Sequence, residues 1–292
     1  MRIVIMGAGD LGSGYGAPLV RAGEDVWFIA RGARLEELRT KGITVHGRLG
    51  DPPLKVRATD NPADAGIADL VLFCVKTYDL ENAAEQIKSV IGPETVVIPV
   101  QNGIYARDRL ARVLGDRPVL GGTGFIRFGE WDGTLSPRVT RVAEVFTKAG
   151  LRHRAVTNIQ EEVWKKFIVA VAGNGALTLL RMSGEFLMSR PETDEFMRGV
   201  GEEALAVARA SGVNLTAHAV DEMMAQARSV PPTYTSSMAR DFASGRRLEL
   251  DDHNGTVVWL GRKFGVPTPL NFAVFAMLKP FADGRPAAAP TA

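Results

Sequence analysis

Apolar and polar positions follow different patterns in the two halves of the chain. The first half alternates short, β-branched apolar runs with longer segments of helical period. The strand candidates are Arg2–Met6, Asp25–Ile29, Leu70–Val75, Thr95–Val100 and Leu151–Val156, and the helix candidates between them are Leu11–Ala22, Leu35–Lys41, Leu80–Ile91 and Ala106–Leu114. Such alternation is typical of a parallel sheet with helices on both faces, so we predict a doubly wound α/β domain over residues 1–155.

The second half lacks strand-like runs and consists of amphipathic segments. These are Glu161–Leu180, Thr193–Ala210, Ala217–Met224, Tyr234–Ala243 and Asp252–Phe264. They predict an all-α domain over residues 156–283. Residues 284–292 are rich in proline and alanine without a pattern, and we expect them to form a disordered tail.

Composition narrows the possible partners. The 292 residues carry 35 basic and 33 acidic side chains, and this balance excludes the basic field that nucleic-acid binding requires. The apolar runs are too short to span a bilayer, and the first strand leads straight into a glycine loop with no room for a secretion signal. The single cysteine, Cys74, lies in an apolar run, which favours a buried thiol in a reducing compartment. We expect a soluble, cytoplasmic protein.

A glycine loop follows the first strand and opens the first helix. It reads Gly7, Ala8, Gly9, Asp10, Leu11 and Gly12, the G-x-G-x-x-G pattern. The first glycine permits the tight turn, the second lets a pyrophosphate approach the backbone, and the third lets helix and strand pack closely. The helix N-terminus then attracts the phosphates, so this half is predicted to be a Rossmann-type dinucleotide-binding domain.

The end of the second strand indicates which dinucleotide binds. An NAD enzyme places Asp or Glu there, whereas this chain has Arg31, followed by Arg34. Arginine pairs bidentately with a 2′-phosphate, so NADPH/NADP+ is the expected cofactor. The alternative is that both arginines are merely the solvated start of a helix.

Two more polar residues follow strand candidates. Lys76 comes after the Leu70–Val75 run, and Asn102 comes after Thr95–Val100. Since the carboxyl ends of parallel strands face the ligand crevice, both should meet cofactor or substrate. Asn102-Gly103 is also an ordinary turn dipeptide.

One face of the first long helix of the second half carries polar groups. Lys166, Ala170 and Asn174 follow one another at intervals of four residues and therefore share a stripe. The stripe could line a cleft, although spacing alone favours a solvated Lys166.

The chain resembles the ketopantoate reductase (2-dehydropantoate 2-reductase) family along nearly its whole length. The matching motifs occur in order: the glycine loop, Val75-Lys76, Gln101-Asn102-Gly103, Trp164-Lys165-Lys166, Ser236-Ser237-Met238, and Glu249 in the segment that runs to Gly255. The resemblance implies reduction of 2-dehydropantoate to (R)-pantoate with NADPH, on the route to pantothenate and coenzyme A.

The resemblance also implies roles for individual residues. Lys166 would be the proton donor, and Glu249 would contact the bound ligands as a second catalytic group. Asn174 and Ser237 would bind the substrate, and Ser237 would contact the carboxylate of the substrate. Lys76 and Asn102 would hold the cofactor, with Asn102 also near the substrate. Hydride transfer to a 2-keto carbon leaves negative charge on the oxygen, and a lysine supplies both the cation and the acid that this charge needs.

The histidines offer no competing acid at the level of sequence. His46, His153, His218 and His253 form no pair with a carboxylate at a recognisable spacing, and neither they nor Cys74 make a metal-ligand pattern. We therefore expect no metal site, with the histidines at the surface or in packing roles.

Two departures from the family bear on the substrate. Ala170 stands where the family usually has a second asparagine, and Phe125 follows Gly121-Gly122-Thr123 where the family inserts a hairpin over the cofactor. Two alternatives therefore stay open: a reductase of another 2-oxo acid, or a non-catalytic NADP(H)-binding regulator. Apolar stripes left over in the helical half would suit a homodimer, or they could all be buried within one chain.

Overall fold

The chain divides into two compact units, Met1–Glu162 and Val163–Ala292. The computed structural model describes residues 1–44, 53–124, 126–187 and 189–286. His46, Phe125 and residues 287–292 of the expected tail lie outside the described residues. The predicted domain boundary, after residue 155, falls slightly before the division between the units, which lies within the long helix α6 (Ile159–Leu180).

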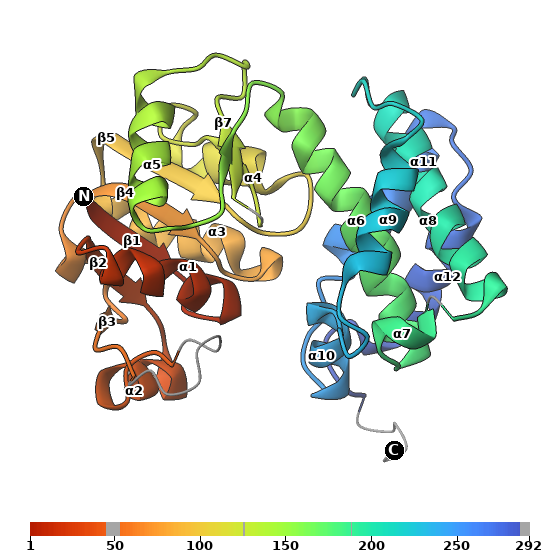
Figure 1. Cartoon of the computed structure of the whole chain (residues 1–292), viewed down its shortest axis with the longest axis horizontal. Coiled ribbons are helices and arrows are strands. Elements are labelled where there is room, and N and C mark those ends of the chain that lie inside the picture. The colour runs from red at the N-terminus through yellow and green to blue at the C-terminus, as the bar shows by residue number, and fades with distance from the viewer. Residues whose placement is uncertain (45–52, 125, 188, 287–292) are drawn as a thin grey trace. The chain divides into compact units, whose positions relative to one another are not determined.

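A five-stranded parallel sheet forms the centre of the first unit (Figure 1). Its strand order is β3-β2-β1-β4-β5, with β3 Arg57–Thr59, β2 Asp25–Ile29, β1 Arg2–Met6, β4 Ala68–Phe73 and β5 Ile91–Pro99. This doubly wound order confirms the predicted fold class. The strand β3 has only three residues and was not predicted.

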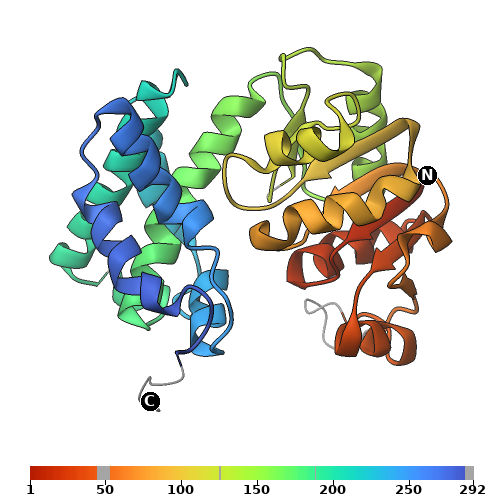
Figure 2. The same ribbon diagram turned by 180° about the vertical axis from the view of Figure 1, so that it is seen from behind.

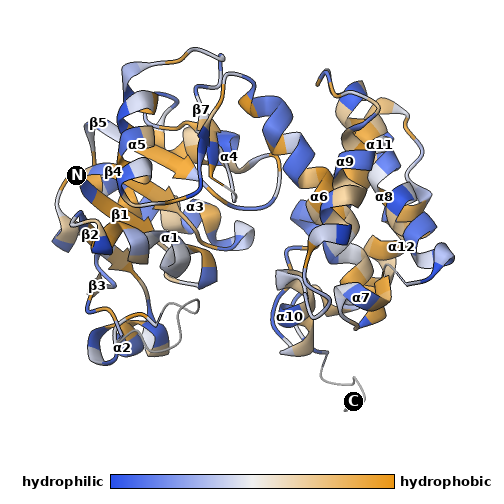
Figure 3. Ribbon diagram, viewed as in Figure 1, coloured by the Kyte–Doolittle hydropathy of each residue, from blue (hydrophilic) through white to orange (hydrophobic). Residues whose placement is uncertain are grey.

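Helices cover both faces of the sheet, and alternate strand residues supply the two cores. Helices α1 (Asp10–Arg21) and α5 (Pro137–Lys148) lie on one face, while α3 (Leu80–Gln86) and α4 (Ala106–Leu114) lie on the other, as Figures 1 and 2 show from opposite sides. Ile3 and Ile5 pack with the core of the first face, whereas Val4 and Met6 pack with the second. Helix α2 (Gly32–Thr40) adds Leu35 and Leu38 to the first core. The central strands β1 and β4 accordingly appear largely hydrophobic in Figure 3, as expected for strands buried on both faces.

A second, three-stranded sheet adjoins β5 and corrects one prediction. It contains β6 (Gly121–Thr123), β7 (Arg127–Gly129) and β8 (Arg154–Ala155). The predicted strand Leu151–Val156 is reduced to the two residues of β8 and pairs with β7 rather than with the main sheet. Strands β6 and β7 are antiparallel, and Thr123 lies opposite Arg127.

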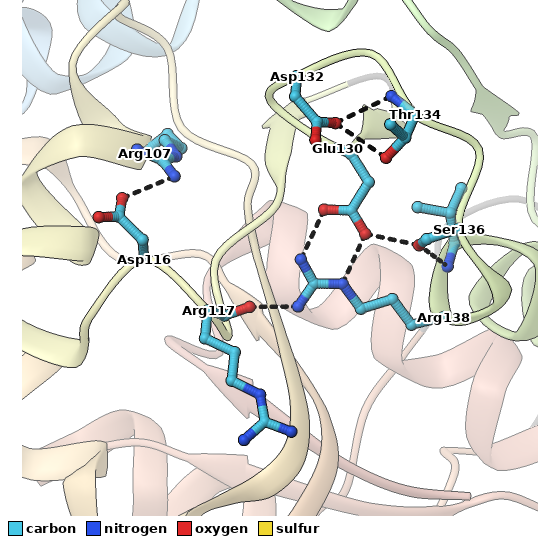
Figure 4. A network of polar contacts seen from close by, with 9 residues as sticks. Arg107, Asp116, Arg117, Glu130, Asp132, Thr134, Ser136 and Arg138 are labelled. Carbon is cyan, nitrogen blue, oxygen red and sulfur yellow. Dashed lines mark hydrogen bonds and ion pairs between the residues drawn. The ribbon is translucent and has the colours of Figure 1, made fainter.

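An ion-pair network fixes the connection from β7 to α5 (Figure 4). The Arg138 guanidinium donates to both carboxylate oxygens of Glu130, at 2.6 and 2.5 Å, and also to the Arg117 carbonyl. Ser136 donates to Glu130 through its hydroxyl and caps α5 by accepting from the N–H of Val139. The Arg138 guanidinium holds the pKa of the Glu130 carboxyl below its usual range. Helix α5 was not predicted, although Ser136-Pro137 is a typical helix start.

All the regular secondary structure in the described residues of the second unit is helical. Its elements are α6 Ile159–Leu180, α7 Gly184–Leu187, α8 Pro191–Ala210, α9 Ala219–Ser229, α10 Ser237–Ala243, α11 Thr256–Phe264 and α12 Pro269–Leu278, with a short π-helical turn at Asp251–Gly255. Helices α7 and α12 were not predicted. Short 3-10 turns lie at Pro62–Ala65, Thr77–Asp79, Ile87–Val90 and Lys279–Phe281. The predicted helix Leu80–Ile91 is therefore divided between α3 and a 3-10 turn, and Ile91 begins β5.

Glycines let the helices of this unit approach closely. A Cβ on Gly199 of α8 would lie 2.4 Å from Leu270, and one on Gly175 of α6 would lie 2.8 Å from Val274. Helix α6 is long and apolar enough to cross a membrane by length and composition, but 67% of its most apolar window is buried inside the structure. That burial is the pattern of a core helix.

Candidate functional site

The glycine loop between β1 and α1 has the geometry that a phosphate cradle requires. Gly7 has φ +100°, a left-handed value that an L side chain rarely adopts. A Cβ on Gly12 would lie 1.9 Å from the Gly7 carbonyl oxygen, so only glycine fits there. A Cβ on Gly9, in contrast, would have no neighbouring atom of the described residues within 4 Å. The first turn of α1 therefore begins next to room for a ligand, with the N–H groups of a helix N-terminus facing it.

Arg34 of α2 braces this loop. Its Nε donates to the Ala8 carbonyl at 2.8 Å, and its Nη2 donates to the Ser13 hydroxyl at 2.7 Å. Its Nη1 pairs with Glu37 at 2.5 Å. Arg34 is therefore not a merely solvated arginine, because its guanidinium holds the glycine loop and pairs with Glu37.

The carboxyl ends of four parallel strands meet at one edge of the sheet. Met6 is level with Ile29 in β2 and with Phe73 in β4, and Phe73 is level with Pro99 in β5. Lys76 and Asn102 lie the same number of residues beyond Phe73 and Pro99, so they follow neighbouring strands at the same edge. Both are half-buried. The edge lies at the point where strand order reverses between β1 and β4, the place where open α/β sheets bind ligands.

A cavity of about 220 Å³ opens beside the glycine loop. Gly7, Ala8 and Gly9 line one wall, the end of β2 with Arg31 lines a second, and α3 with the turn before it lines a third. Arg31 is exposed over 72% of its side chain, and its Nη2 lies 3.7 Å from Oδ2 of Asp79. Asp79 was not predicted as a site residue, because it comes from a segment far from Arg31 in the sequence.

The turn that carries Lys76 and Asp79 is held in place by Arg109 of α4. Arg109 donates to the Thr77 carbonyl at 2.8 Å and to both carboxylate oxygens of Glu81 at 2.6 Å. The hydrogen bond from Arg109 lowers the pKa of the Glu81 carboxyl. Arg109 therefore positions residues that line the cavity without lining it itself.

Two buried polar side chains lie at the ends of neighbouring elements: Gln101 follows β5, and Thr123 ends β6, which contacts β5. Gln101 is 6% exposed and Thr123 is 2% exposed. Within the described part of the chain, neither the Gln101 amide nor the Thr123 hydroxyl has a hydrogen-bond partner. Unsatisfied buried groups are costly, and in native proteins they are concentrated at functional positions. In the sequence, Gln101 was noted only as a member of the Gln101-Asn102-Gly103 motif.

The predicted stripe on α6 lies in the second unit. Lys166 is half-buried, whereas Ala170 is 4% and Asn174 is 7% exposed. The Asn174 amide nitrogen lies 3.4 Å from Nδ1 of His253, which is completely buried in the π-helical turn before α11. His253 has non-helical backbone angles there, so the chain is kinked at this residue. His253 thus has the packing role expected of it, and its contact with Asn174 was not predicted.

The other predicted residues of this unit lie on separate elements. Glu249 is 6% exposed and precedes the π-helical turn. Ser237 is the half-buried first residue of α10, and its neighbour Ser236 caps that helix by accepting from the Ala239 N–H at 3.1 Å. The structure therefore brings Asn174 and His253 together. Ser237 lies at the start of α10, and Glu249 lies shortly before the turn Asp251–Gly255.

One expectation about the histidines is wrong. Nδ1 of His218 lies 3.7 Å from Asp221, one helical turn away, so this histidine does pair with a carboxylate. It remains a surface residue, 82% exposed. His153 packs against Phe128 and Phe146. Among the described residues, no three His, Cys, Asp or Glu side chains gather as metal ligands.

Cys74 follows β4 directly and is partly buried. Its thiol points to the Leu72 carbonyl at 3.6 Å. Burial raises the pKa of this thiol, so it is not a reactive thiolate.

The first unit fits a dinucleotide on its own geometry. The open space at Gly9 and the tight contacts at Gly7 and Gly12 match the pyrophosphate position, and the adjoining cavity has room for a ribose beside Arg31. The unpartnered Gln101 and Thr123 provide hydrogen-bonding capacity near the end of β5. These features are independent of any comparison with other proteins.

Known proteins match both units. The family model described as ketopantoate reductase PanE/ApbA matches residues 3–136, and the model of its C-terminal part matches residues 158–282. The 2-dehydropantoate 2-reductase of Archaeoglobus fulgidus is 34% identical, covering 97% of this chain and 98% of its own. The crystal structure of 2-dehydropantoate 2-reductase from Geobacter metallireducens GS-15 is similar with a TM-score of 0.88 at 28% identity, over 96% of this chain and 99% of its own. D-mandelate dehydrogenase, solved with NADH and anilino(oxo)acetate, also has a TM-score of 0.88 over 97% of this chain and 98% of its own, but at 22% identity it shows the fold alone.

Proposed function

The chain belongs to the ketopantoate reductase family, and from this premise we propose that it reduces 2-dehydropantoate to (R)-pantoate with NADPH. Membership confirms the resemblance found in the sequence and makes the protein an NAD(P)-dependent oxidoreductase that acts on CH–OH groups. The substrate, the choice of NADPH and the roles of individual residues are our proposals. The product would enter the synthesis of pantothenate and coenzyme A.

The observation that carries the proposal is the cradle at the glycine loop. Gly7 and Gly12 allow the tight approach of loop and helix, and the open space at Gly9 adjoins the cavity with Arg31. We propose that the loop Gly7 to Gly12 binds the pyrophosphate and that Arg31 binds the 2′-phosphate. Lys76 and Asn102, at the next two strand ends, would hold the rest of the cofactor.

Lys166 is proposed as the general acid. When bound, the nicotinamide cofactor would supply the hydride that reduces the 2-keto carbon of the substrate. Negative charge then develops on the keto oxygen, and the Lys166 ammonium would stabilise this charge and donate a proton to that oxygen. The half-buried position of Lys166 on α6 is suited to this task, because partial desolvation strengthens a charge interaction.

Three further residues would position the substrate. Asn174 lies on the same face of α6 as Lys166, eight residues further along the helix. The contact of its side-chain amide with His253 limits the rotation of that amide. Ser237 would bind the substrate carboxylate, and the buried Glu249 would contact the bound ligands. The Asn174 and Ser237 side chains supply hydrogen-bonding groups of the kind that a hydroxylated 2-oxo acid needs.

A different 2-oxo acid is the second candidate substrate. Ala170 carries no hydrogen-bonding group on the stripe between Lys166 and Asn174, so a less polar or bulkier substrate would lose less there. A non-catalytic regulator is a weaker alternative, because Lys166 and Glu249 are both present. We further propose a cytoplasmic enzyme, in keeping with its single thiol, and a homodimer as its assembly.

A substrate panel tests the proposal directly. Oxidation of NADPH would be followed by absorbance with 2-dehydropantoate, 2-oxoisovalerate and 2-oxo-2-phenylacetate. We expect the highest kcat/KM with 2-dehydropantoate. A higher kcat/KM with another 2-oxo acid would show that this acid, and not 2-dehydropantoate, is the preferred substrate. Turnover of none of the acids would favour the non-catalytic regulator. Gel filtration of the same preparation tests the dimer.

A further inference from the structure

An acidic side chain shares the 2′ end of the proposed cofactor cavity with Arg31. Asp79 and Arg31 both line the cavity, with 3.7 Å between the carboxylate and the guanidinium. Their side chains are 40% and 72% exposed, so both are accessible to a ligand. Asp79 is anchored by its N–H, which donates to the Lys76 carbonyl, and by the Arg109 bond to Thr77.

Among the described residues, the other cation at the cavity is already engaged in hydrogen bonds. Arg34 also lines the cavity, but its guanidinium is bonded to Ala8, Ser13 and Glu37. The polar groups that α3 contributes, Asn82 and Gln86, are neutral. Among the described residues that line the cavity, Arg34 is thus paired with Glu37, and the remaining charges are those of Arg31 and the opposing Asp79.

The two charges act in opposite directions on the two nicotinamide cofactors. A 2′-phosphate would gain a charge-assisted pair with Arg31, but it must compete with Asp79 for that guanidinium and is repelled by the carboxylate. A free 2′-hydroxyl would donate a hydrogen bond to Asp79, as the ribose does to the acidic residue of NAD enzymes. Arginine alone would give a strong preference for NADPH, whereas the pair weakens it.

We propose that Asp79 is a specificity-determining residue that reduces discrimination against NADH, so that the enzyme accepts both cofactors. The inference rests on the proposed function in one respect: the cavity must hold the adenosine ribose of a nicotinamide cofactor. It does not depend on the identity of the 2-oxo acid.

Binding of nucleotide fragments tests the inference without turnover. Calorimetric titration of the full-length protein with 2′,5′-ADP and with 5′-ADP gives two dissociation constants, whose ratio reports the 2′ end alone. Removing the Asp79 charge in Asp79→Asn should tighten 2′,5′-ADP about three- to tenfold relative to 5′-ADP, the scale expected for one partly exposed charge. The effect should shrink at high salt because exposed charges are screened.

Two matched variants separate charge from structure. Asp79→Glu keeps the charge and should leave the ratio within about twofold of the parent. Glu85→Gln makes the same change of charge on α3, the helix that follows Asp79 directly. Glu85 pairs with Lys88 at 2.6 Å and does not line the cavity, so this variant should also leave the ratio unchanged. Thermal melts would confirm that all variants fold.

Each outcome decides between the two proposals. An unchanged ratio in Asp79→Asn, or an equal shift in Glu85→Gln, overturns the role of Asp79. If the parent binds neither fragment, both this inference and the cofactor part of the proposed function are wrong. If the ratio shifts as expected but no 2-oxo acid is reduced, only the proposed function fails.

Discussion

Arg31 and Arg34 lie three positions apart at the start of α2, and their surroundings give them different tasks. Arg34 uses its guanidinium to hold the glycine loop through Ala8 and Ser13. Arg31 lines the cavity and lies at a longer distance, 3.7 Å, from its partner Asp79. Residue type alone does not separate the two, because both are arginines at the end of the same predicted strand.

Substitution of these arginines should therefore give different signatures. Arg31→Ala should weaken NADPH about tenfold and NADH little, because only the 2′-phosphate loses a charged partner. Arg34→Met should weaken both cofactors by a similar factor, about three- to tenfold, because the loop that binds their common pyrophosphate loses its brace. Fluorescence titrations with each cofactor measure the four constants. An unchanged preference in Arg31→Ala would remove Arg31 from the 2′-phosphate site.

The elements that the sequence predicts well are those whose pattern is local. Strands β1 and β2 and helix α4 have the predicted bounds, because each is a short run with a clear period between turn residues. Helix α12 was missed because Pro269–Leu278 is apolar nearly all round and shows no stripe. The pairing of β8 with β7 was missed because the partner of a strand depends on residues distant in the sequence.

The candidate site divides in the same way. The glycine loop, Arg31, Lys76 and Asn102 follow from motif and strand order, since parallel strands bring their carboxyl ends to one edge. Asp79 and His253 do not, because each acquires its role through a contact with a distant segment. Their side chains alone carry no signal of those contacts.

The connection from β7 to α5 offers a test of stability at the scale of elements. The Glu130 side chain is 12% exposed and bonded to Arg138 and Ser136. Glu130→Gln should lower the free energy of unfolding at pH 7 by about 1–3 kcal/mol, because it leaves a partly buried guanidinium without its charge partner. Glu94→Gln is the control, since the Glu94 pair with Arg117 is exposed over 74% and 71% of the two side chains and should cost less than about 0.5 kcal/mol.

The same pair predicts a pH dependence. The Arg138 guanidinium lowers the pKa of the Glu130 carboxyl in the folded state, so the unfolded chain binds the proton more readily. The stabilisation is complete above the unfolded pKa, about 4.3, and is lost as the pH falls through the lower folded value. Urea unfolding at pH 7 and near pH 4 should therefore show a smaller difference between parent and Glu130→Gln at the acid pH. A difference that does not change with pH would contradict this assignment.

At the scale of the whole molecule, the proposed tasks are divided between two units. The glycine loop, Arg31, Lys76 and Asn102 belong to Met1–Glu162, whereas Lys166, Asn174, Ser237 and Glu249 belong to Val163–Ala292. The predicted change from alternating strands to amphipathic helices after residue 155 lies close to this division. It follows that cofactor affinity and proton donation should respond to different substitutions.

Lys166→Ala tests this division. Loss of a positioned acid typically costs about 10²–10⁴ in rate, so kcat should fall by that order while the affinity for NADPH stays nearly intact, because the groups proposed to bind it lie in the other unit. Lys165→Ala is the matched control: its ammonium lies 3.6 Å from Glu222, and it should keep kcat within a few-fold of the parent. Steady-state kinetics and a fluorescence titration of NADPH, made on the same preparations, provide both quantities. A Lys166→Ala protein that binds NADPH normally and turns over within a few-fold of the parent would show that Lys166 is not the acid, and a large loss of NADPH affinity would show that the two tasks are not separate.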